Sequence, residues 1–263
     1  MPIYNSPVFS IDAAETRRYA GLQKADFSQQ LIDDACMEAQ LLIQPKGSWH
    51  IYEYDADRQL LHSPAGTCTA RKAAPDELQT ASLTDSKSLT LQGDSIGRHL
   101  RDCCQAIVMA ATVGEAIENQ VTRCFEEGRY SFSVLLDAAA TAAVEQVADA
   151  MEKTIRNEVK RQGLAMKWRF SPGYGDWPIQ QQTDILKLAQ GADIGISLTD
   201  SLMLMPRKSI TAVIGLYYPD ANPACNASDG SRGNKANDLP AGKKHDCSCC
   251  DKLDCPARLE TKG

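Results

Sequence analysis

The strongest periodic pattern in the sequence predicts one long helix from about Val134 to Gln162. Apolar residues recur in this stretch at every third or fourth position, and that spacing places them along one stripe of an α-helix. The stripe consists of Leu136, Ala140, Val144, Val147, Met151, Ile155 and Val159. Gly163 follows at the place where a glycine often ends a helix. Any fold for this chain must therefore bury one side of a helix of this length.

Shorter patterns surround the long helix and follow no regular strand–helix–strand rhythm. Periodicity and breaker residues predict helices at 11–20, about 26–43, 94–101, 115–127 and 179–190, the helix at 94–101 being capped by Asp94 or Ser95. Strands are predicted at 49–54, 59–62, 88–91, 106–113, 196–199 and 210–217. The run 106–113 is apolar throughout, which is typical of a buried strand. We therefore expect an α+β fold, with a mainly antiparallel sheet flanked by helices.

The composition is that of a globular protein and argues against two classes of function. The 263 residues are 43% hydrophobic and 24% charged, with a net charge of -6. This acidic balance argues against a nucleic-acid partner, because phosphate contacts need a basic surface. No apolar run is long enough to span a membrane, and the first residues show no signal peptide. We expect a cytoplasmic protein, in which the ten cysteines are reduced thiols or metal ligands.

The most distinctive local segment is the ten-residue stretch from Arg169 to Pro178. Two prolines and two glycines in this stretch exclude regular secondary structure. Arg169 offers a planar fork for a carboxylate or phosphate, and Tyr174 and Trp177 offer aromatic faces for a flat ring or a cation. The alternative is a Pro/Gly-rich connection whose arginine is simply solvated.

Two ordered motifs resemble a known family. The first is Arg169-x-Ser171-Pro172-Gly173-Tyr174, and the second is Gly195-Ile196-Ser197-Leu198-Thr199-Asp200-Ser201-x-Met203-x-Met205-Pro206-x-x-Ser209. Their order and separation resemble the activation domain of cobalamin-dependent methionine synthase. Ser171 stands where that family has alanine, and Asp200 where it has glutamate. The resemblance covers roughly residues 94–217, is weaker before them and is absent after them.

The resemblance implies an S-adenosylmethionine site and names its residues. Arg169 is expected to bind the ligand's carboxylate, while adenine and ribose lie along the backbone from Ser171 to Gly173, beside Tyr174. Glu145 on the long helix is expected to face the cationic sulfonium and amino groups. The alternative for Glu145 is a merely solvated position, because it shares a helix face with Asp149 and Glu152. No catalytic acid or base is expected, and the family's N-terminal acid and late tyrosine find no clear counterpart.

The family resemblance also implies a role in methionine biosynthesis. The chain is too short for the substrate and cobalamin modules of the full synthase and lacks the corrinoid motif Asp-x-His-x-x-Gly. It is therefore expected to act in trans, supporting the reductive methylation of cob(II)alamin on a separate methionine synthase or corrinoid methyltransferase. An electron donor such as a flavodoxin or ferredoxin would be the other partner. The alternatives are an iron–sulfur electron-transfer protein that docks a corrinoid partner, and a ligand-binding regulator without turnover.

The composition changes after Pro219, which suggests three parts: a domain at 1–219, a flexible linker at 220–244 and a cysteine-rich tail at 245–263. Four cysteines within nine residues, with no apolar surroundings, are more typical of metal ligation than of packing. They are Cys247, Cys249, Cys250 and Cys255. An iron–sulfur cluster would use four thiolates, whereas zinc would accept three thiolates and His245. Reactivation needs an electron, so the cluster is favoured; free thiols are the remaining alternative.

Overall fold

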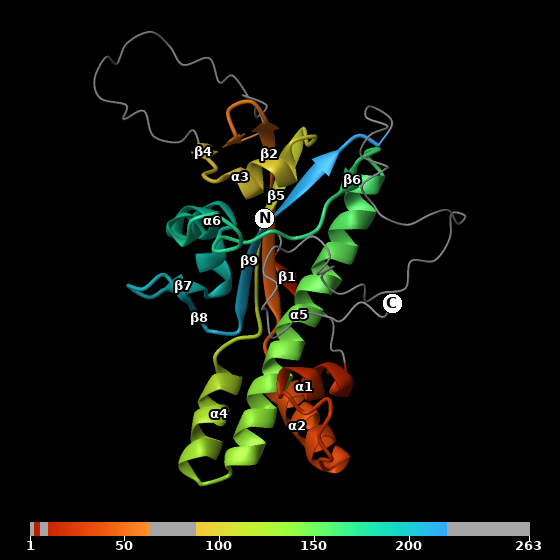
Figure 1. The fold of residues 1–263 in the computed structure, drawn as a ribbon, viewed down its shortest axis with the longest axis vertical. Coiled ribbons are helices and arrows are strands. Elements are labelled where there is room, and N and C mark those ends of the chain that lie inside the picture. The colour runs from red at the N-terminus through yellow and green to blue at the C-terminus, as the bar shows by residue number, and fades with distance from the viewer. Residues whose placement is uncertain (1–2, 6–9, 64–87, 220–263) are drawn as a thin grey trace, which may run out of the picture. The chain divides into compact units, whose positions relative to one another are not determined.

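Strand β5 (Gln105–Thr112) lies inside an antiparallel sheet and is covered on both faces. The computed structural model describes residues 3–5, 10–63 and 88–219, which belong to one compact unit, Met1–Asn226. Within these residues a seven-stranded sheet has the order β4-β3-β2-β5-β9-β6, and β1 pairs with β2 (Figure 1). The strands are β1 Tyr4–Asn5, β2 Lys46–Asp55, β3 Leu60–His62, β4 Ser88–Thr90, β5, β6 Ala165–Met166 and β9 Ser209–Tyr217. A separate hairpin pairs β7 (Ser197–Leu198) with β8 (Leu204–Met205).

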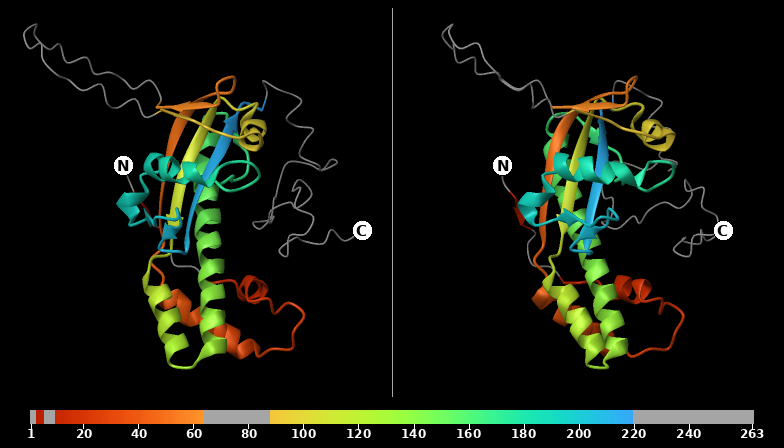
Figure 2. Two further views of the ribbon diagram at one scale, coloured as in Figure 1. Left: turned by 60° about the vertical axis from the view of Figure 1, so that its left-hand side comes forward. Right: turned by 90° about the vertical axis from the view of Figure 1, so that its left-hand side faces the viewer.

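Helices cover the two faces of the sheet unequally. The long helix α5 (Tyr130–Lys160) packs on one face, and α1 (Ala13–Tyr19), α2 (Gln29–Leu42) and α4 (Ala116–Glu126) pack against it. The other face carries α3 (Asp94–Leu100), the short helices η1 (Ile179–Gln181) and η2 (Gly191–Ile194), and α6 (Gln182–Leu188). Figure 2 shows the sheet between α5 and α6. The predicted α+β class, with an antiparallel sheet flanked by helices, is confirmed.

The alternation of side chains along β5 explains its continuous apolar sequence. Ile107, Met109 and Ala111 belong to the core under α5, whereas Ala106, Val108 and Ala110 belong to the core on the opposite face. Successive side chains of a strand point to opposite faces, so both sets must be apolar when both faces are covered. The apolar stripe predicted for α5 is buried at all seven positions.

Several details differ from the sequence-based expectations. Helix α5 begins at Tyr130, four residues before the expected start, and the helix expected at 179–190 is divided into η1 and α6. The short strands β1, β6 and β8 gave no signal, because two residues are too few for a period. Neither Asp94 nor Ser95 caps α3, whose N-cap is Gly93. The linker 220–244 and the tail 245–263 lie outside the described residues. No described helix is both long and apolar enough to cross a lipid bilayer.

The contact between α5 and β2 leaves no room for a side chain at Gly47. A methyl group there would overlap the sulfur and terminal methyl of Met151, which is fully buried on α5, so the flexible end of Met151 would have to change its rotamer within the core. Gly47→Ala should therefore lower the free energy of unfolding by about 1–3 kcal/mol, as overpacking usually does. The measurement is urea denaturation at neutral pH.

The double variant Gly47→Ala/Met151→Ala distinguishes overlap from a backbone effect. The double variant should lose less unfolding free energy than the two single variants lose together, because the smaller residue at 151 removes the clash. Strictly additive losses would show that Gly47 is needed for another reason.

Candidate functional site

The segment before the Pro/Gly-rich loop runs along the edge of β9. The Lys167 amide donates to the Gly215 carbonyl at 2.9 Å, and Phe170 exchanges two backbone hydrogen bonds with Val213 at 2.9 and 2.8 Å. The Ser171 hydroxyl then donates to the Thr211 carbonyl at 2.7 Å. Because these hydrogen bonds all go to β9, they fix the position of the backbone at which the loop begins.

Beyond Ser171 the chain forms a tight turn without regular structure, as its sequence predicts. The Tyr174 amide donates to the Ser171 carbonyl at 3.2 Å, and the Trp177 amide donates to Tyr174 at 3.0 Å. Gly173 has φ +90, a conformation that L side chains rarely adopt, so glycine is required there. The buried Trp177 ring donates through Nε1 to Gln181 at 2.7 Å and anchors the turn to η1.

The end of the loop caps a distant helix. One oxygen of the Asp176 carboxylate accepts the Asp94 amide at 2.8 Å, and the other accepts the Ser95 amide at 2.8 Å and contacts the Ser95 hydroxyl. The hydrogen bond from the Ser95 side chain, followed by those from the two amides, lowers the pKa of Asp176 to about 2. The cap of α3 is therefore supplied by the loop and not by the residues at 94 and 95 themselves.

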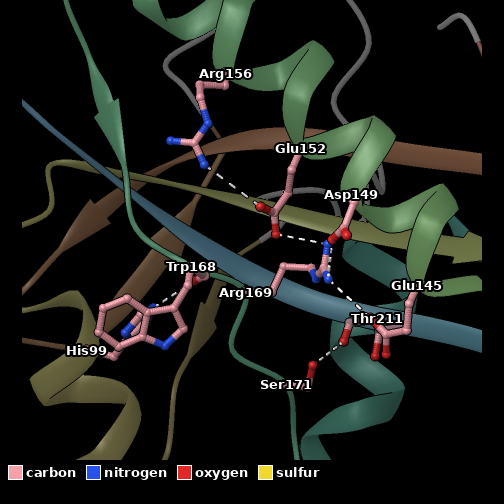
Figure 3. A network of polar contacts seen from close by, with 9 residues as sticks. All are labelled: His99, Glu145, Asp149, Glu152, Arg156, Trp168, Arg169, Ser171 and Thr211. Carbon is pink, nitrogen blue, oxygen red and sulfur yellow. Dashed lines mark hydrogen bonds and ion pairs between the residues drawn. The ribbon is translucent and has the colours of Figure 1, made fainter. Parts of the chain in front are cut away.

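Arg169 is the centre of a polar cluster on α5. Its Nη2 lies 3.2 Å from Glu145 Oε2 and 2.9 Å from Asp149 Oδ1, and its Nη1 lies 3.0 Å from Glu152 Oε1. The three acids are spaced four and three residues apart, so they share one face of the helix. Figure 3 shows Arg169 reaching α5, while the preceding Trp168 points away from it. We call Arg169, Glu145, Asp149 and Glu152 the Arg169 cluster.

The charges of the Arg169 cluster do not balance. Arg169 is 10% exposed, and its burial disfavours the charged form, but Glu152, Asp149 and Glu145 together raise the pKa of Arg169 above its ordinary value. Arg156, which is 54% exposed, lies 3.9 Å from Glu152. Nη1 has the charge of Glu152 beside it but makes no aligned hydrogen bond. Three carboxylates thus surround one buried guanidinium, which leaves the cluster acidic.

The structure brings two of the predicted site residues together. Glu145 contacts Arg169, so it is not simply a solvated residue on the outer face of α5. The same holds for Glu152, which is only 18% exposed. Ser171 and Gly173 hold the turn described above, and Tyr174 is exposed on it. The roles of these residues in ligand binding stay predictions.

His99 is the residue of this region that the sequence did not reveal. No motif surrounds it in the sequence. Its buried ring lies 4.6 Å from the Trp168 ring and 5.1 Å from the Phe170 ring, between centroids. Its Nε2 lies 3.1 Å from the Trp168 carbonyl oxygen. Burial, with a smaller contribution from Lys167, lowers the pKa of His99 to about 4.

The second sequence motif ends in a segment fixed to α4 and α5. The Lys208 amide donates to Glu118 at 2.8 Å, and Lys208 Nζ lies 2.9 Å from Asp137 and 2.9 Å from the Thr141 hydroxyl. Glu118 itself is buried. Each motif therefore contains a cation that contacts the polar side of α5: Arg169 in the first motif and Lys208, just before β9, in the second.

Two hollows of the described surface lie away from the Arg169 cluster. One of about 420 Å³ is lined by residues of α6 and η2, and another of about 180 Å³ lies beside Trp49 and Glu158. Neither is lined by the Arg169 cluster, which opens to solvent through Asp149, whose side chain is 62% exposed. Among residues 3–5, 10–63 and 88–219, no group of His, Cys, Asp and Glu could hold a metal ion. The tail ligands proposed above, Cys247, Cys249, Cys250 and Cys255, lie outside these residues.

Comparisons with known proteins find matches among solved structures only. No family model and no curated protein sequence matches the chain. A solved structure, the MetH reactivation domain bound to AdoHcy, matches with a TM-score of 0.49 and 16% identity. The match covers 74% of this chain and 66% of that one, just under two thirds of its length. A likeness this partial leaves the function to be argued from the site itself.

The geometry of the Arg169 cluster predicts that Arg169 contributes much more to the free energy of unfolding than Arg156 does. Arg169→Ala should lower the free energy of unfolding by about 2 kcal/mol, because it leaves neighbouring carboxylates without their buried cation. Arg156→Ala should change it by less than about 0.5 kcal/mol, since an exposed pair contributes little. Urea denaturation of both variants checks this, and equal effects would contradict the central position of Arg169.

The lowered pKa of His99 predicts a specific pH dependence of stability. Because the folded state favours the neutral ring, stability is lost as the pH falls from 6.5, the ordinary value, to about 4. The loss should amount to roughly 3 kcal/mol.

The variant His99→Phe cannot titrate and serves as the reference for this effect. The difference in unfolding free energy between parent and variant should shrink across that pH range and stay constant above pH 7. A difference that does not change between pH 8 and pH 4 would contradict the buried neutral histidine.

Proposed function

We propose that the chain binds S-adenosylmethionine at the Arg169 cluster and supports the reductive reactivation of a corrinoid methyltransferase. One observation carries this proposal. The family resemblance assigns Arg169 and Glu145, which are 24 positions apart, to one ligand site, and their side chains lie 3.2 Å apart. A purely solvated arginine and a purely solvated glutamate would have no reason to meet.

The charge of the cluster suits the cationic half of the ligand. S-adenosylmethionine carries a sulfonium and an ammonium group, and both favour nearby carboxylates. Glu145 and Asp149 are 35% and 62% exposed, so their oxygens are accessible to such a ligand. Among the ion pairs of the described residues, Arg169 and the exposed Arg156 are two cations against three acids, so a cationic ligand would meet an excess of negative charge.

The carboxylate of the ligand requires a rearrangement at Arg169. The guanidinium is already surrounded by α5 carboxylates, so an incoming carboxylate has to take the place of one of them. Asp149 is the most exposed of the three and returns to water at the lowest cost. Arg169 then keeps Glu152, the most buried acid, as its partner on the helix.

In this proposal the chain binds and orients, and its partner carries cobalamin. The rigid turn from Ser171 to Trp177 would hold the purine and ribose while the cluster holds the methionyl end, so that the sulfonium methyl faces the partner. A corrinoid protein and a flavodoxin- or ferredoxin-like electron donor are the proposed partners. A metal centre in the tail would supply or relay the electron.

The direct test is calorimetry of the full chain with S-adenosylmethionine at neutral pH. Glu145→Gln should weaken binding by about tenfold, the loss of one charge-assisted contact. The control is Glu158→Gln, which makes the same change of charge on α5 outside the Arg169 cluster. Glu152 is unsuitable as a control because it contacts Arg169.

Two results would contradict the proposal. A parent chain that binds no S-adenosylmethionine would remove it altogether. Equal, small effects of the substitutions at 145 and 158 would place the ligand away from the cluster.

A further inference from the structure

We propose that His99 is a positioning residue for the ligand loop: from α3 it holds the two neighbours of Arg169, and thereby directs Arg169 toward α5. The inference rests on the proposed function for its ligand, but the geometry stands by itself. None of the hydrogen bonds and ring contacts described for His99 joins it to α5 or to the Arg169 cluster. Its effect therefore has to pass through the backbone of the loop.

The hydrogen bond of His99 defines its protonation. A carbonyl oxygen only accepts, so Nε2, 3.1 Å from the Trp168 oxygen, carries the hydrogen and donates it. The lowered pKa keeps the ring uncharged at neutral pH, which leaves Nδ1 without a proton. The bond fixes the peptide group that joins Trp168 to Arg169.

The aromatic contacts of His99 fix the orientation of the same segment. Its ring lies against the rings of Trp168 and Phe170, the residues on either side of Arg169. In extended chain, alternate side chains point to the same side, so Arg169 points the opposite way. That opposite side is occupied by α5, as Figure 3 shows. A rotation of the segment that freed Arg169 would break both ring contacts.

Helix α3 holds the loop at both of its ends. Near its C-terminus, the His99 carbonyl accepts Lys167 Nζ at 2.7 Å. At its N-terminus, the amides of Asp94 and Ser95 donate to Asp176. These contacts bracket the segment 167–176, in which Arg169 lies. Among the α3 residues that make these contacts, His99 is the one whose ring contacts the immediate neighbours of Arg169.

Three substitutions separate the contributions of His99. His99→Phe keeps a flat ring for Trp168 and Phe170 but loses the donor to the Trp168 carbonyl. His99→Gln places an amide N–H near the position of Nε2 and loses the ring. His99→Ala loses both. We expect S-adenosylmethionine to bind about tenfold more weakly to the Ala variant, because small displacements of a positioned group reduce its contribution strongly. The Phe and Gln variants each keep one of the two contacts, so their affinities should lie between those of the Ala variant and the parent.

The matched control is Tyr52→Phe. Tyr52 donates a buried hydrogen bond to the Leu188 carbonyl at 2.8 Å, so its loss is of the same chemical kind but lies away from the loop. Tyr52→Phe should lower the melting temperature while leaving affinity unchanged. If it weakens binding as much as His99→Phe, the effect is general destabilisation and the proposal is wrong.

A second measurement tests the proposal without a ligand. Hydrogen exchange of the Phe170 amide, which donates to Val213 at 2.9 Å, should become at least several-fold faster in His99→Ala and stay unchanged in Tyr52→Phe. Unchanged exchange in His99→Ala, or unchanged affinity in a chain that binds the ligand, would overturn the positioning role. If the parent binds no S-adenosylmethionine but exchange responds as expected, the proposed function fails and the positioning of the loop stands.

Discussion

The contact between the buried guanidinium of Arg169 and the carboxylates of α5 joins the loop beside β9 to the long helix. Arg169 leaves the loop beside β9 and reaches Glu145, Asp149 and Glu152 on the long helix. A buried arginine is tolerated only where charges compensate it, so its position requires the acids to be there. The acids share one face of α5 through their spacing in the helix, and in the proposed function this face meets the cationic end of the ligand.

Helix α5 performs two tasks with two different sides. Its apolar stripe, from Leu136 to Val159, is buried and fixes the helix on the sheet. Its polar side forms ion pairs with two segments next to β9. Asp137 pairs with Lys208 just before β9, and the acids of the Arg169 cluster pair with Arg169 beside β9. Because the buried stripe sets the rotation of the helix, the direction of the polar side follows from the core. The candidate site is thus a consequence of how the core packs.

The sequence predicts the parts of this arrangement that depend on local periodicity. The α5 stripe and β5, which is apolar on both faces, can be read from consecutive residues, and Arg169 and Glu145 could be chosen through the family resemblance. The cap of α3 could not, because its carboxylate comes from Asp176, 82 positions after Asp94. The contacts of His99 could not be predicted for the same reason, because Trp168 and Phe170 are distant from it in the chain. The ion pair between Glu152 and Arg169 could not be predicted either, since a charged stripe on a helix gives no sign of the arginine that will face it.

The most direct test of the account is a crystal structure of the full chain grown with excess S-adenosylmethionine. The account predicts ligand density beside the loop from Arg169 to Trp177, with the sulfonium and amino groups facing Glu145 and Asp149. It also predicts that Trp168 and Phe170 keep their contacts with His99. Ligand bound elsewhere on the chain, with the Arg169 cluster unchanged, would contradict the central claim that this cluster is the binding site.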